Sequence, residues 1–279
     1  MTGTVPNPAL PRRAALTQPV RKAFGEPFFL LARLRRYNAP AFPILTYHSI
    51  SDRPGSDVET VAPADFERQM AWLADREFQV VTVSELLGAM ARMVPKRPMT
   101  ALTFDDGYRD NILIALPILQ RHGFRASFYI STANIGGQSL WNPVDYIGHQ
   151  PMLDETEIRA LSEAGHEIGS HAHSHIDLTS VDLARVEEGL ERSQRVLADI
   201  TRKPVVAFAP PYGRLNGRVV ECAGRLGYSH LVRGGRFSLN PRGTSPYDLQ
   251  RITIARGDSL REFAKKVSGA YQWLTVRDR

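Results

Sequence analysis

The chain of 279 residues contains a single cysteine, Cys222, which excludes an intrachain disulfide and a cysteine-ligated structural zinc site. It has no run of about 20 apolar residues, the length that a transmembrane helix requires. Its N-terminus lacks the basic start, apolar run and small-residue cleavage site of a secretory signal peptide. These absences exclude a disulfide scaffold and predict a cytoplasmic location.

Acidic residues are nearly absent from residues 1–40, where seven Arg and Lys residues face one acidic residue, Glu26. This segment therefore carries the whole formal net charge of +6, and the remainder of the chain is formally neutral. A nucleic-acid-binding domain should carry its basic patch on the folded surface. Nucleic acid is therefore not a predicted partner.

The N-terminal 40 residues differ in pattern from the rest. Residues 1–20 are rich in Pro, Ala, Thr and Arg without periodicity, which predicts disorder. Residues 21–36 place four large apolar side chains near helical spacing among arginines, with Pro27 interrupting them. They fit a helix that contacts the membrane surface, or a helix or loop that packs outside the domain. We expect a basic arm at 1–40 and one catalytic domain at 41–279.

Beyond residue 43, short β-like runs alternate with helical ones. The predicted strands are 44–47, 80–83, 100–104, 125–130, 167–168, 205–209, 229–232 and 251–254. The predicted helices are 64–76, 84–93, 112–122, 155–164, 183–200 and 217–226. This alternation predicts an α/β fold with a parallel sheet, either a barrel or a doubly wound sheet.

Reactive side chains stand where predicted strands end. His48 ends the first strand, Asp105 and Asp106 follow another, and residues 209–213 follow a third. In α/β barrels the active site forms at the carboxyl ends of the strands. We therefore expect these residues to meet at one face of the sheet.

The pair Asp105-Asp106 precedes a glycine that allows a sharp turn, Gly107. Adjacent side chains of an extended segment point to opposite sides, so the two carboxylates can do different work. One can bind a metal ion while the other holds or removes a proton. The alternative is an Asp-Gly turn that caps the following helix.

Three of the eight histidines lie within five residues, at His171, His173 and His175. One helical turn would place His171 and His175 on the same face, and His173 would point elsewhere. Two imidazoles and a carboxylate on one divalent ion leave positions open for water and substrate. A surface histidine cluster is the alternative, but the position directly after a predicted strand favours metal binding.

Together these motifs resemble those of the polysaccharide deacetylases, the carbohydrate esterases that share the NodB homology domain. Residues 103–107 match the family's Thr-Phe-Asp-Asp-Gly motif, and residues 171–175 match His-(Ser/Thr)-x-x-His, with Ala172 in place of the hydroxyl residue. Residues 209–213 match Arg-x-Pro-Tyr-Gly without its arginine. The resemblance covers about residues 43–254 and implies a distorted (β/α)7 barrel.

The resemblance implies a role for each matching residue. Asp106, His171 and His175 would hold a divalent metal ion, zinc in the first place, with cobalt and nickel as alternatives. Asp105 would be the catalytic base, and the backbone N–H of Tyr212 would help to bind the oxyanion. The implied reaction removes N-acetyl groups from a sugar of a polysaccharide, an oligosaccharide or a lipid-linked glycan, and releases acetate.

One family motif has moved to the other end of the chain. The usual C-terminal Leu-x-Leu-His is absent from residues 251–255, but residues 44–48 are similar to it. This arrangement resembles the permuted exopolysaccharide deacetylases of the poly-N-acetylglucosamine type. Because the first and last strands of a closed barrel are neighbours, we expect His48 to be the general acid. A histidine that caps a strand in a turn is the alternative.

The family's third-motif arginine and its Asp-x-x-Asp-Trp motif are also missing. Arg251 precedes the last predicted strand, in a setting similar to that of an arginine in the permuted subgroup. We expect Arg251 to supply the positive charge beside Asp105. On this hypothesis, Arg251→Ala slows catalysis sharply and leaves folding and metal content intact.

The predicted substrate-binding residues are Pro210, Pro211, Tyr212 and Trp141. Tyr212 and Trp141 would stack on a sugar face, with core packing as the alternative for Trp141. Two other functions stay open, namely hydrolysis of another C–N bond in a small amide or imide, and carbohydrate binding without catalysis. The complete set of metal ligands, base and candidate acid argues against carbohydrate binding without catalysis. Without an export signal, we expect a biosynthetic intermediate as substrate, with residues 21–36 near the inner membrane surface.

Overall fold

The computed structural model describes residues 41–53, 58–92, 96–139, 141, 150–234 and 238–271. The predicted basic arm, including the segment 21–36 with its expected membrane contact, lies outside the described residues. Within the described ranges, no helix has the length and apolar character needed to cross a membrane.

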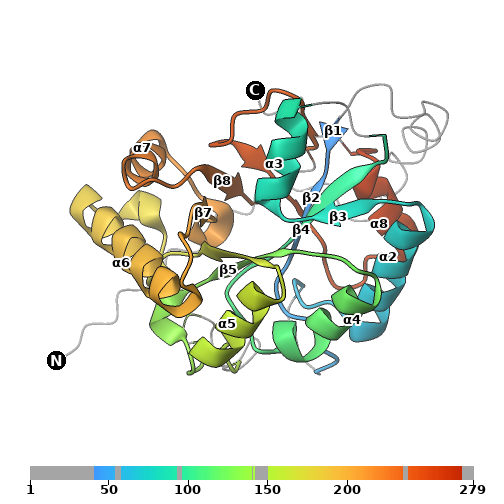
Figure 1. Cartoon of the computed structure of the whole chain (residues 1–279), viewed down its shortest axis with the longest axis horizontal. Helices are drawn as coiled ribbons and strands as arrows, with labels where there is room; N and C mark the ends of the chain where they lie inside the picture. Colours follow the sequence, from blue (N-terminus) through green and yellow to red (C-terminus); the bar gives the residue numbers. More distant parts are fainter. Residues whose placement is uncertain are drawn as a thin grey trace.

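A parallel sheet forms the centre of the fold (Figure 1). Its strands are β2 (Ile44–Tyr47), β3 (Gln79–Val81), β4 (Met99–Phe104), β5 (Ser127–Ile130), β6 (Glu167–Ser170), β7 (Ala207–Phe208), β8 (His230–Arg233), β10 (Leu249–Gln250) and β11 (Ile252–Thr253). The order is β10-β8-β7-β6-β5-β4-β2-β11, and β3 pairs with the first half of β4. β1 (Ala41–Phe42) and β9 (Asn240–Pro241) form a separate antiparallel pair.

The two ends of this strand order belong to one chain segment, because only Arg251 separates β10 from β11. Leu249 of β10 pairs with Val232 of β8, and Ile252 of β11 pairs with Leu45 of β2. The segment thus contacts both the last and the first strand of the series. It closes the described sheet into a barrel of seven strand positions, which confirms the predicted distorted (β/α)7 barrel.

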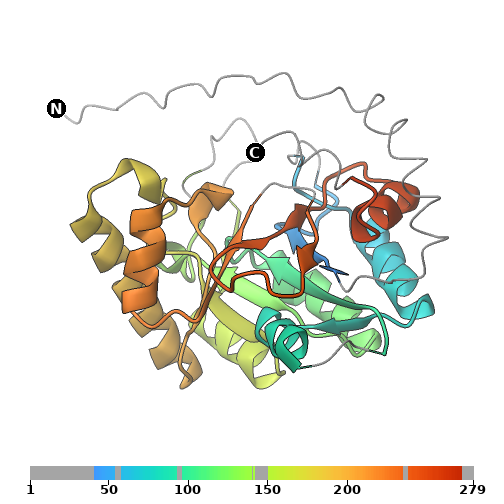
Figure 2. The same ribbon diagram turned by 90° about the horizontal axis from the view of Figure 1, so that it is seen from above.

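Helices cover the outside of the sheet in both views (Figures 1 and 2). They are α2 (Pro63–Asp75), α3 (Val83–Arg92), α4 (Leu116–Arg121), α5 (Glu155–Glu163), α6 (Leu183–Thr201), α7 (Gly217–Arg225) and α8 (Leu260–Val267). Short helical turns add η1 (Asn111–Ala115), η2 (Thr132–Asn134), η3 (Leu178–Ser180) and η4 (Pro211–Gly213). The apolar stripe of α2, formed by Phe66, Met70 and Leu73, packs into the same core as the apolar side chains of the sheet.

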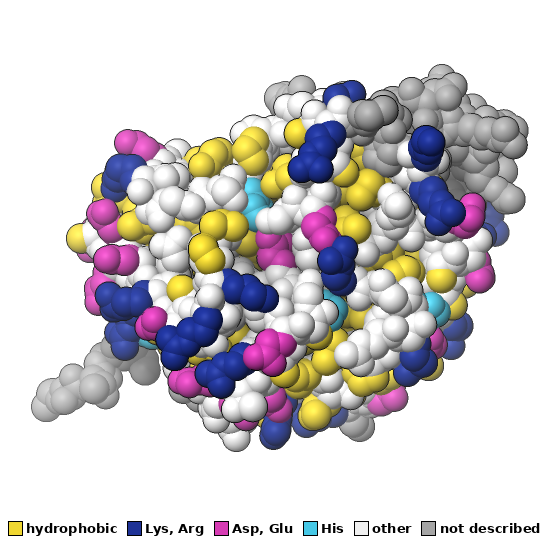
Figure 3. Space-filling model, in the orientation of Figure 1, with side chains coloured by type: hydrophobic (Ala, Val, Ile, Leu, Met, Phe, Trp, Pro, Cys, Tyr) yellow, Lys and Arg dark blue, Asp and Glu magenta, His cyan; other side chains and the backbone are white. Residues whose placement is uncertain are grey.

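Aromatic side chains fill the core between the sheet and α2. Phe104 stacks on Phe128 at a ring distance of 4.8 Å and on Tyr47 at 5.5 Å. Charged side chains of both signs are interspersed over the face shown in Figure 3. The expected helix 112–122 differs in one respect, because its first turn, η1, is a π-helix. The expected strand 205–209 is also shorter, since only Ala207–Phe208 pairs with its neighbours.

Candidate metal centre

The predicted reactive residues come together at the carboxyl ends of the parallel strands. His48 follows β2, and Asp105 and Asp106 follow β4. His171 and His175 lie in the loop after β6. This is the end of the barrel at which the loops of (β/α) folds build active sites.

Three side chains share the geometry of a metal-binding site. The Nε2 atoms of His171 and His175 each lie 3.3 Å from Oδ1 of Asp106. One ligand atom from each of the three residues lies within 4.8 Å of the others. Donors about 2.0–2.1 Å from a tetrahedral ion are separated by about 3.3–3.4 Å. Oδ1 of Asp106 is buried without a hydrogen-bond partner among the described residues, so the donor set fits a divalent cation.

Neighbouring groups orient both imidazoles. Nδ1 of His171 donates a hydrogen bond to the carbonyl of Ala209 at 2.8 Å, which assigns the tautomer that leaves the Nε2 lone pair free. The ring of His175 lies between two aromatic rings, stacked on Trp141 at 4.5 Å and edge-on to Tyr212 at 4.7 Å. Both histidines therefore point at Asp106 before any ion binds.

The backbone between the histidines is not helical, so the prediction that one helical turn aligns them is wrong. Ala172 has a φ of +62°, which a right-handed helix excludes. Its carbonyl accepts a hydrogen bond from the N–H of Thr132, and the carbonyl of His173 accepts one from Ala133. These bonds to η2 take the place of helical ones, and the loop brings the two imidazoles together through its bend. Asp106 also adopts a left-handed φ, of +73°.

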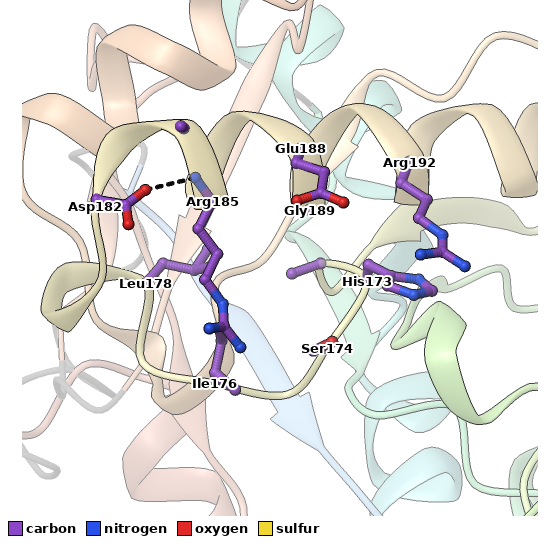
Figure 4. A pocket seen from close by; sticks show the side chains of 11 residues that line it. His173, Ser174, Ile176, Leu178, Asp182, Arg185, Glu188, Gly189 and Arg192 are labelled. Carbon is purple, nitrogen blue, oxygen red and sulfur yellow. Dashed lines mark hydrogen bonds between the residues drawn. The ribbon is translucent and has the colours of Figure 1, made fainter.

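His173 points away from the metal centre, as its spacing predicted. Its Nδ1 contacts Oγ1 of Thr132 at 2.9 Å. The ring lines a cavity of about 520 Å³ between this loop and α6, on the side where Glu188 and Arg192 project from the helix (Figure 4). His173 thus anchors the loop that carries the metal ligands.

Asp105 forms a buried ion pair with Arg251. Nη1 and Nη2 of Arg251 donate to the two carboxylate oxygens of Asp105, each at 2.6 Å. Arg251 is 1% exposed and also donates to the carbonyl of Arg233 and to Oγ1 of Thr103. Burial raises the pKa of Asp105, but the Arg251 charge and hydrogen bonds outweigh it, and the net pKa is lowered. Asp105 is therefore ionised at neutral pH.

His48 lies beside an acidic side chain at the rim of the barrel. Its Nε2 is 3.5 Å from Oε2 of Glu59, and its side chain is 17% exposed. Burial lowers the pKa of His48, whereas Glu59, Asp106 and Asp105 raise it, and the net pKa is raised. The imidazole can therefore carry a proton near neutral pH.

Tyr212 follows β7 in the turn η4 and has a left-handed φ of +60°. Its backbone N–H donates to no other described residue, so it is open to an incoming oxygen. A Cβ on Gly213 would lie 2.5 Å from Cα of Gly234, so only glycine allows the close backbone contact that holds this turn. Pro210 and Pro211 are buried, and the exposed surface of the turn is Tyr212 at 56%.

Trp141 lies beside the metal centre and not in the barrel core. Its ring stacks on His175, with the ring of Tyr108 tilted at 6.5 Å. The side chain is partly exposed, so one ring can contact both a metal ligand and a bound molecule.

The model of the polysaccharide deacetylase family matches residues 92–231, which is half of the chain. The chain belongs to the polysaccharide deacetylase family. The matched range contains the three candidate metal ligands and Asp105.

Relatives of this polysaccharide deacetylase extend the similarity beyond that range. It is 28% identical to YxkH of Bacillus subtilis over 82% of this chain and 75% of YxkH. It is 24% identical to the poly-beta-1,6-N-acetyl-D-glucosamine N-deacetylase of Escherichia coli over 81% of this chain and 38% of that enzyme. The structure of the deacetylase PplD of Streptococcus pyogenes shares the fold, with a TM-score of 0.71, 22% identity and coverage of 82% and 99%.

Sequence reasoning missed Glu59 in this polysaccharide deacetylase. Glu59 stands in an irregular segment, and no motif or periodicity marks it. The contact with His48 arises because Ile50 and Val61 form a parallel bridge, which places the residues just before Val61 beside the end of β2. The intervening sequence contains the turn signal Pro54-Gly55, but a turn signal does not specify which side chains it brings together.

Proposed function

We propose that this protein is a metal-dependent deacetylase that removes N-acetyl groups from an N-acetylated sugar of a glycan and releases acetate. The observation that carries this proposal is the convergence of Asp106, His171 and His175 on one point beside the ion-paired Asp105. Family membership supports it, as do relatives named for deacetylation of poly-beta-1,6-N-acetyl-D-glucosamine and of chitin.

The donor set favours zinc, with cobalt and nickel as alternatives. Two imidazole nitrogens and one carboxylate oxygen, with room left for water and substrate, are typical of hydrolytic zinc sites. A divalent ion bound there would polarise the acetyl carbonyl and lower the pKa of water to about 7. Asp106, His171 and His175 would hold it.

Asp105 acts as the base in this proposal. Its carboxylate takes the proton from the water molecule whose oxygen attacks the acetyl carbon. Arg251 keeps the carboxylate ionised and fixes its plane through two hydrogen bonds. As the carbonyl oxygen gains negative charge, the open N–H of Tyr212 donates to it, and one such donor is worth about 2.7–4 kcal/mol.

His48 acts as the acid. As the bond between the acetyl carbon and the sugar nitrogen breaks, the protonated imidazole gives its proton to that nitrogen. Glu59 favours the protonated form before the reaction. The products are acetate and a sugar with a free amine, which is cationic at neutral pH and changes the charge of the glycan.

The exposed ring of Tyr212 and the partly exposed ring of Trp141 suit a sugar substrate. Tyr212 and Trp141 each contact His175, so both rings border the point where the acetyl group would bind. Aromatic faces bury the apolar face of a sugar ring and leave its hydroxyls free to bond with water or protein. Catalysis at an N-acetylated sugar is therefore favoured over hydrolysis of a small cyclic amide.

The proposal is tested by acetate release from N-acetylglucosamine oligomers, measured after chelation and again after return of zinc. We expect zinc-dependent release by the wild type. Asp105→Asn should lower the rate by about 10²–10⁴-fold while zinc stays bound. Glu167→Gln is the matched control, because it alters another carboxylate of the sheet, on the first residue of β6, at the amino end of the barrel.

The possible outcomes distinguish an error in the proposed substrate from an error in the proposed metal site. Stoichiometric zinc without acetate release would contradict the glycan substrate and favour another C–N bond. A wild-type protein that binds no divalent metal would contradict the proposed function as a whole.

A further inference from the structure

Two side chains that the mechanism does not use hold the segment that carries His48. Nδ2 of Asn111 donates a hydrogen bond to the carbonyl of His48 at 2.8 Å. Asp110 accepts two, at Oδ2 from the hydroxyl of Ser49 at 2.5 Å and at Oδ1 from the N–H of Ile50 at 3.2 Å. Three consecutive residues are thus bound by one neighbouring pair, Asp110 and Asn111, which we call the His48 clamp.

The clamp belongs to the same segment as the base and a metal ligand. Asp105 donates its N–H to the carbonyl of Tyr47 at 3.0 Å, so residues 47–50 are held from one side by residues 105–111. Asn111 is fully buried, and its Nδ2 also donates to Oδ1 of Asp110 at 2.9 Å. The position of His48 relative to Asp105 and Asp106 therefore depends on these contacts.

The local backbone also departs from a regular helix at this point. Asn111 is the first residue of the π-helix η1, and its carbonyl accepts the N–H of Leu116, five residues on. Single π-turns are rare and are frequently found at functional sites. Asn111 is buried and Asp110 is partly buried, and both side chains bond to the His48 segment. The hydrogen bonds to the His48 segment, and not helix stability, therefore explain why polar residues occupy positions 110 and 111.

We propose that Asp110 and Asn111 are positioning residues that hold the general acid His48 in place for proton transfer. This inference rests on the function proposed above. Proton transfer requires a heavy-atom distance of about 2.6–3.2 Å between the acid and the leaving nitrogen. A displacement of about 1 Å can lower a rate by about 10²-fold. The clamp acts through the backbone of His48 and touches no reacting atom.

The leaving group distinguishes this role from a general structural one. An amine leaves only when it is protonated, so amide hydrolysis depends on a well-placed acid. A nitrophenolate is a stable anion and leaves without that proton. Loss of the clamp should therefore slow the hydrolysis of N-acetyl groups and have little effect on nitrophenyl acetate.

The experiment compares Asn111→Ala, His48→Ala, the double variant and the wild type on N-acetylglucosamine oligomers and on nitrophenyl acetate. The control is Gln194→Ala, because Nε2 of Gln194 also donates to a backbone carbonyl, that of Val205 at 2.9 Å, at the amino end of β7. We expect Asn111→Ala to lower kcat on the oligomers by about 10- to 100-fold and to change ester hydrolysis little. In the His48→Ala background the same change should have little further effect.

Two additions keep the proposal testable if Asn111→Ala folds poorly or oligomers are not cleaved. Ser49→Ala removes one bond of the clamp and should give a smaller loss with the same preference for the amide. The nuclear magnetic resonance signals of the His48 ring should shift in Asn111→Ala and stay unchanged in Gln194→Ala, whether or not the glycan reacts.

Several results would overturn the role of the clamp. One is an equal loss of kcat on the amide and the ester in Asn111→Ala. Another is a double variant whose loss of kcat equals the product of the two single losses. The third is a His48 ring signal that stays unshifted in Asn111→Ala. A wild type that releases no acetate from oligomers would instead contradict the proposed function, and the His48 signals would still decide whether the clamp holds the ring.

Discussion

The two ends of the barrel each place a histidine next to a glutamate, with opposite effects on the imidazole. At the carboxyl end, Nε2 of His48 lies 3.5 Å from Glu59, and at the amino end, Nε2 of His230 lies 3.7 Å from Glu167. The pKa of His48 is raised, whereas the pKa of His230 is lowered. A close carboxylate therefore does not by itself decide whether a histidine is charged.

The neighbours of each pair explain the difference. Burial lowers the pKa of both histidines, and the side chain of His230 is only 1% exposed against 17% for His48. Asp105 and Asp106 join Glu59 in raising the pKa of His48, whereas the charge that raises the pKa of His230 is that of Glu167. Glu167 is also hydrogen-bonded to the hydroxyls of Ser84 and Ser127. Several carboxylates around a partly open imidazole produce a proton donor, and one carboxylate beside a buried imidazole produces a neutral core residue.

The largest expected effect comes from removing each histidine in turn. His48→Ala should lower kcat on N-acetylglucosamine oligomers by about 10²–10⁴-fold, because the leaving nitrogen loses its acid. His230→Ala should leave kcat nearly unchanged and lower the free energy of unfolding by about 1–3 kcal/mol, because it empties a buried site. Kinetics and urea unfolding of both variants measure this contrast. A comparable loss of turnover in the two variants would show that the ends of the barrel do not differ in role.

The next effect concerns Arg251, whose removal was expected from the sequence to leave folding intact. The burial of its ion pair with Asp105 argues against that expectation. Arg251→Ala leaves a buried carboxylate without its partner and should cost about 3–5 kcal/mol of unfolding free energy, in addition to slowing turnover. The control is Arg233→Ala, which breaks an exposed pair with Asp248 and should cost at most about 1 kcal/mol.

Urea unfolding of Arg251→Ala and of Arg251→Ala/Asp105→Asn shows why the Arg251 variant loses unfolding free energy. The double variant should recover part of the lost stability, since it removes the unpaired charge. If the double variant is as unstable as the single one, lost packing and not the buried charge is responsible.

The smallest expected effect is on the pH profile. Glu59→Gln removes a charge that raises the pKa of His48, so the pKa should fall. Because the acid must be protonated, activity declines as pH rises through that pKa, and the alkaline limb should move to lower pH. Glu167→Gln should leave the limb in place. Rate profiles of both variants measure this, and an unmoved limb in Glu59→Gln would exclude Glu59 as a determinant of the acid.

Much of the barrel could be predicted from the sequence, because its strands are short apolar runs between helices with a clear apolar stripe. The reactive residues at the ends of the predicted strands then indicate that the active site lies at one face of the sheet. The predicted partnership of Arg251 and Asp105 came from the resemblance to the permuted subgroup, and the structure places their atoms at 2.6 Å. The adjacency of the first and last strands supported the expected place of His48, and β2 and β11 do pair.

The remaining features depend on irregular backbone. The loop of His171 and His175 bends at a left-handed Ala172, which its sequence does not predict. The contacts of Asn111 and Glu59 with His48 span turns that have no periodic pattern. Side chains in such segments are placed by tertiary hydrogen bonds, and these overrule local propensity.

The barrel closes through the segment from Leu249 to Thr253, which is synthesised after the other strands of the described sheet. Until then Asp105 lacks its ion-pair partner, and an unpaired carboxylate resists burial. The segment that joins the two edges of the sheet also delivers that partner, Arg251. The closing of the sheet and the pairing of Asp105 with Arg251 therefore belong to one folding step.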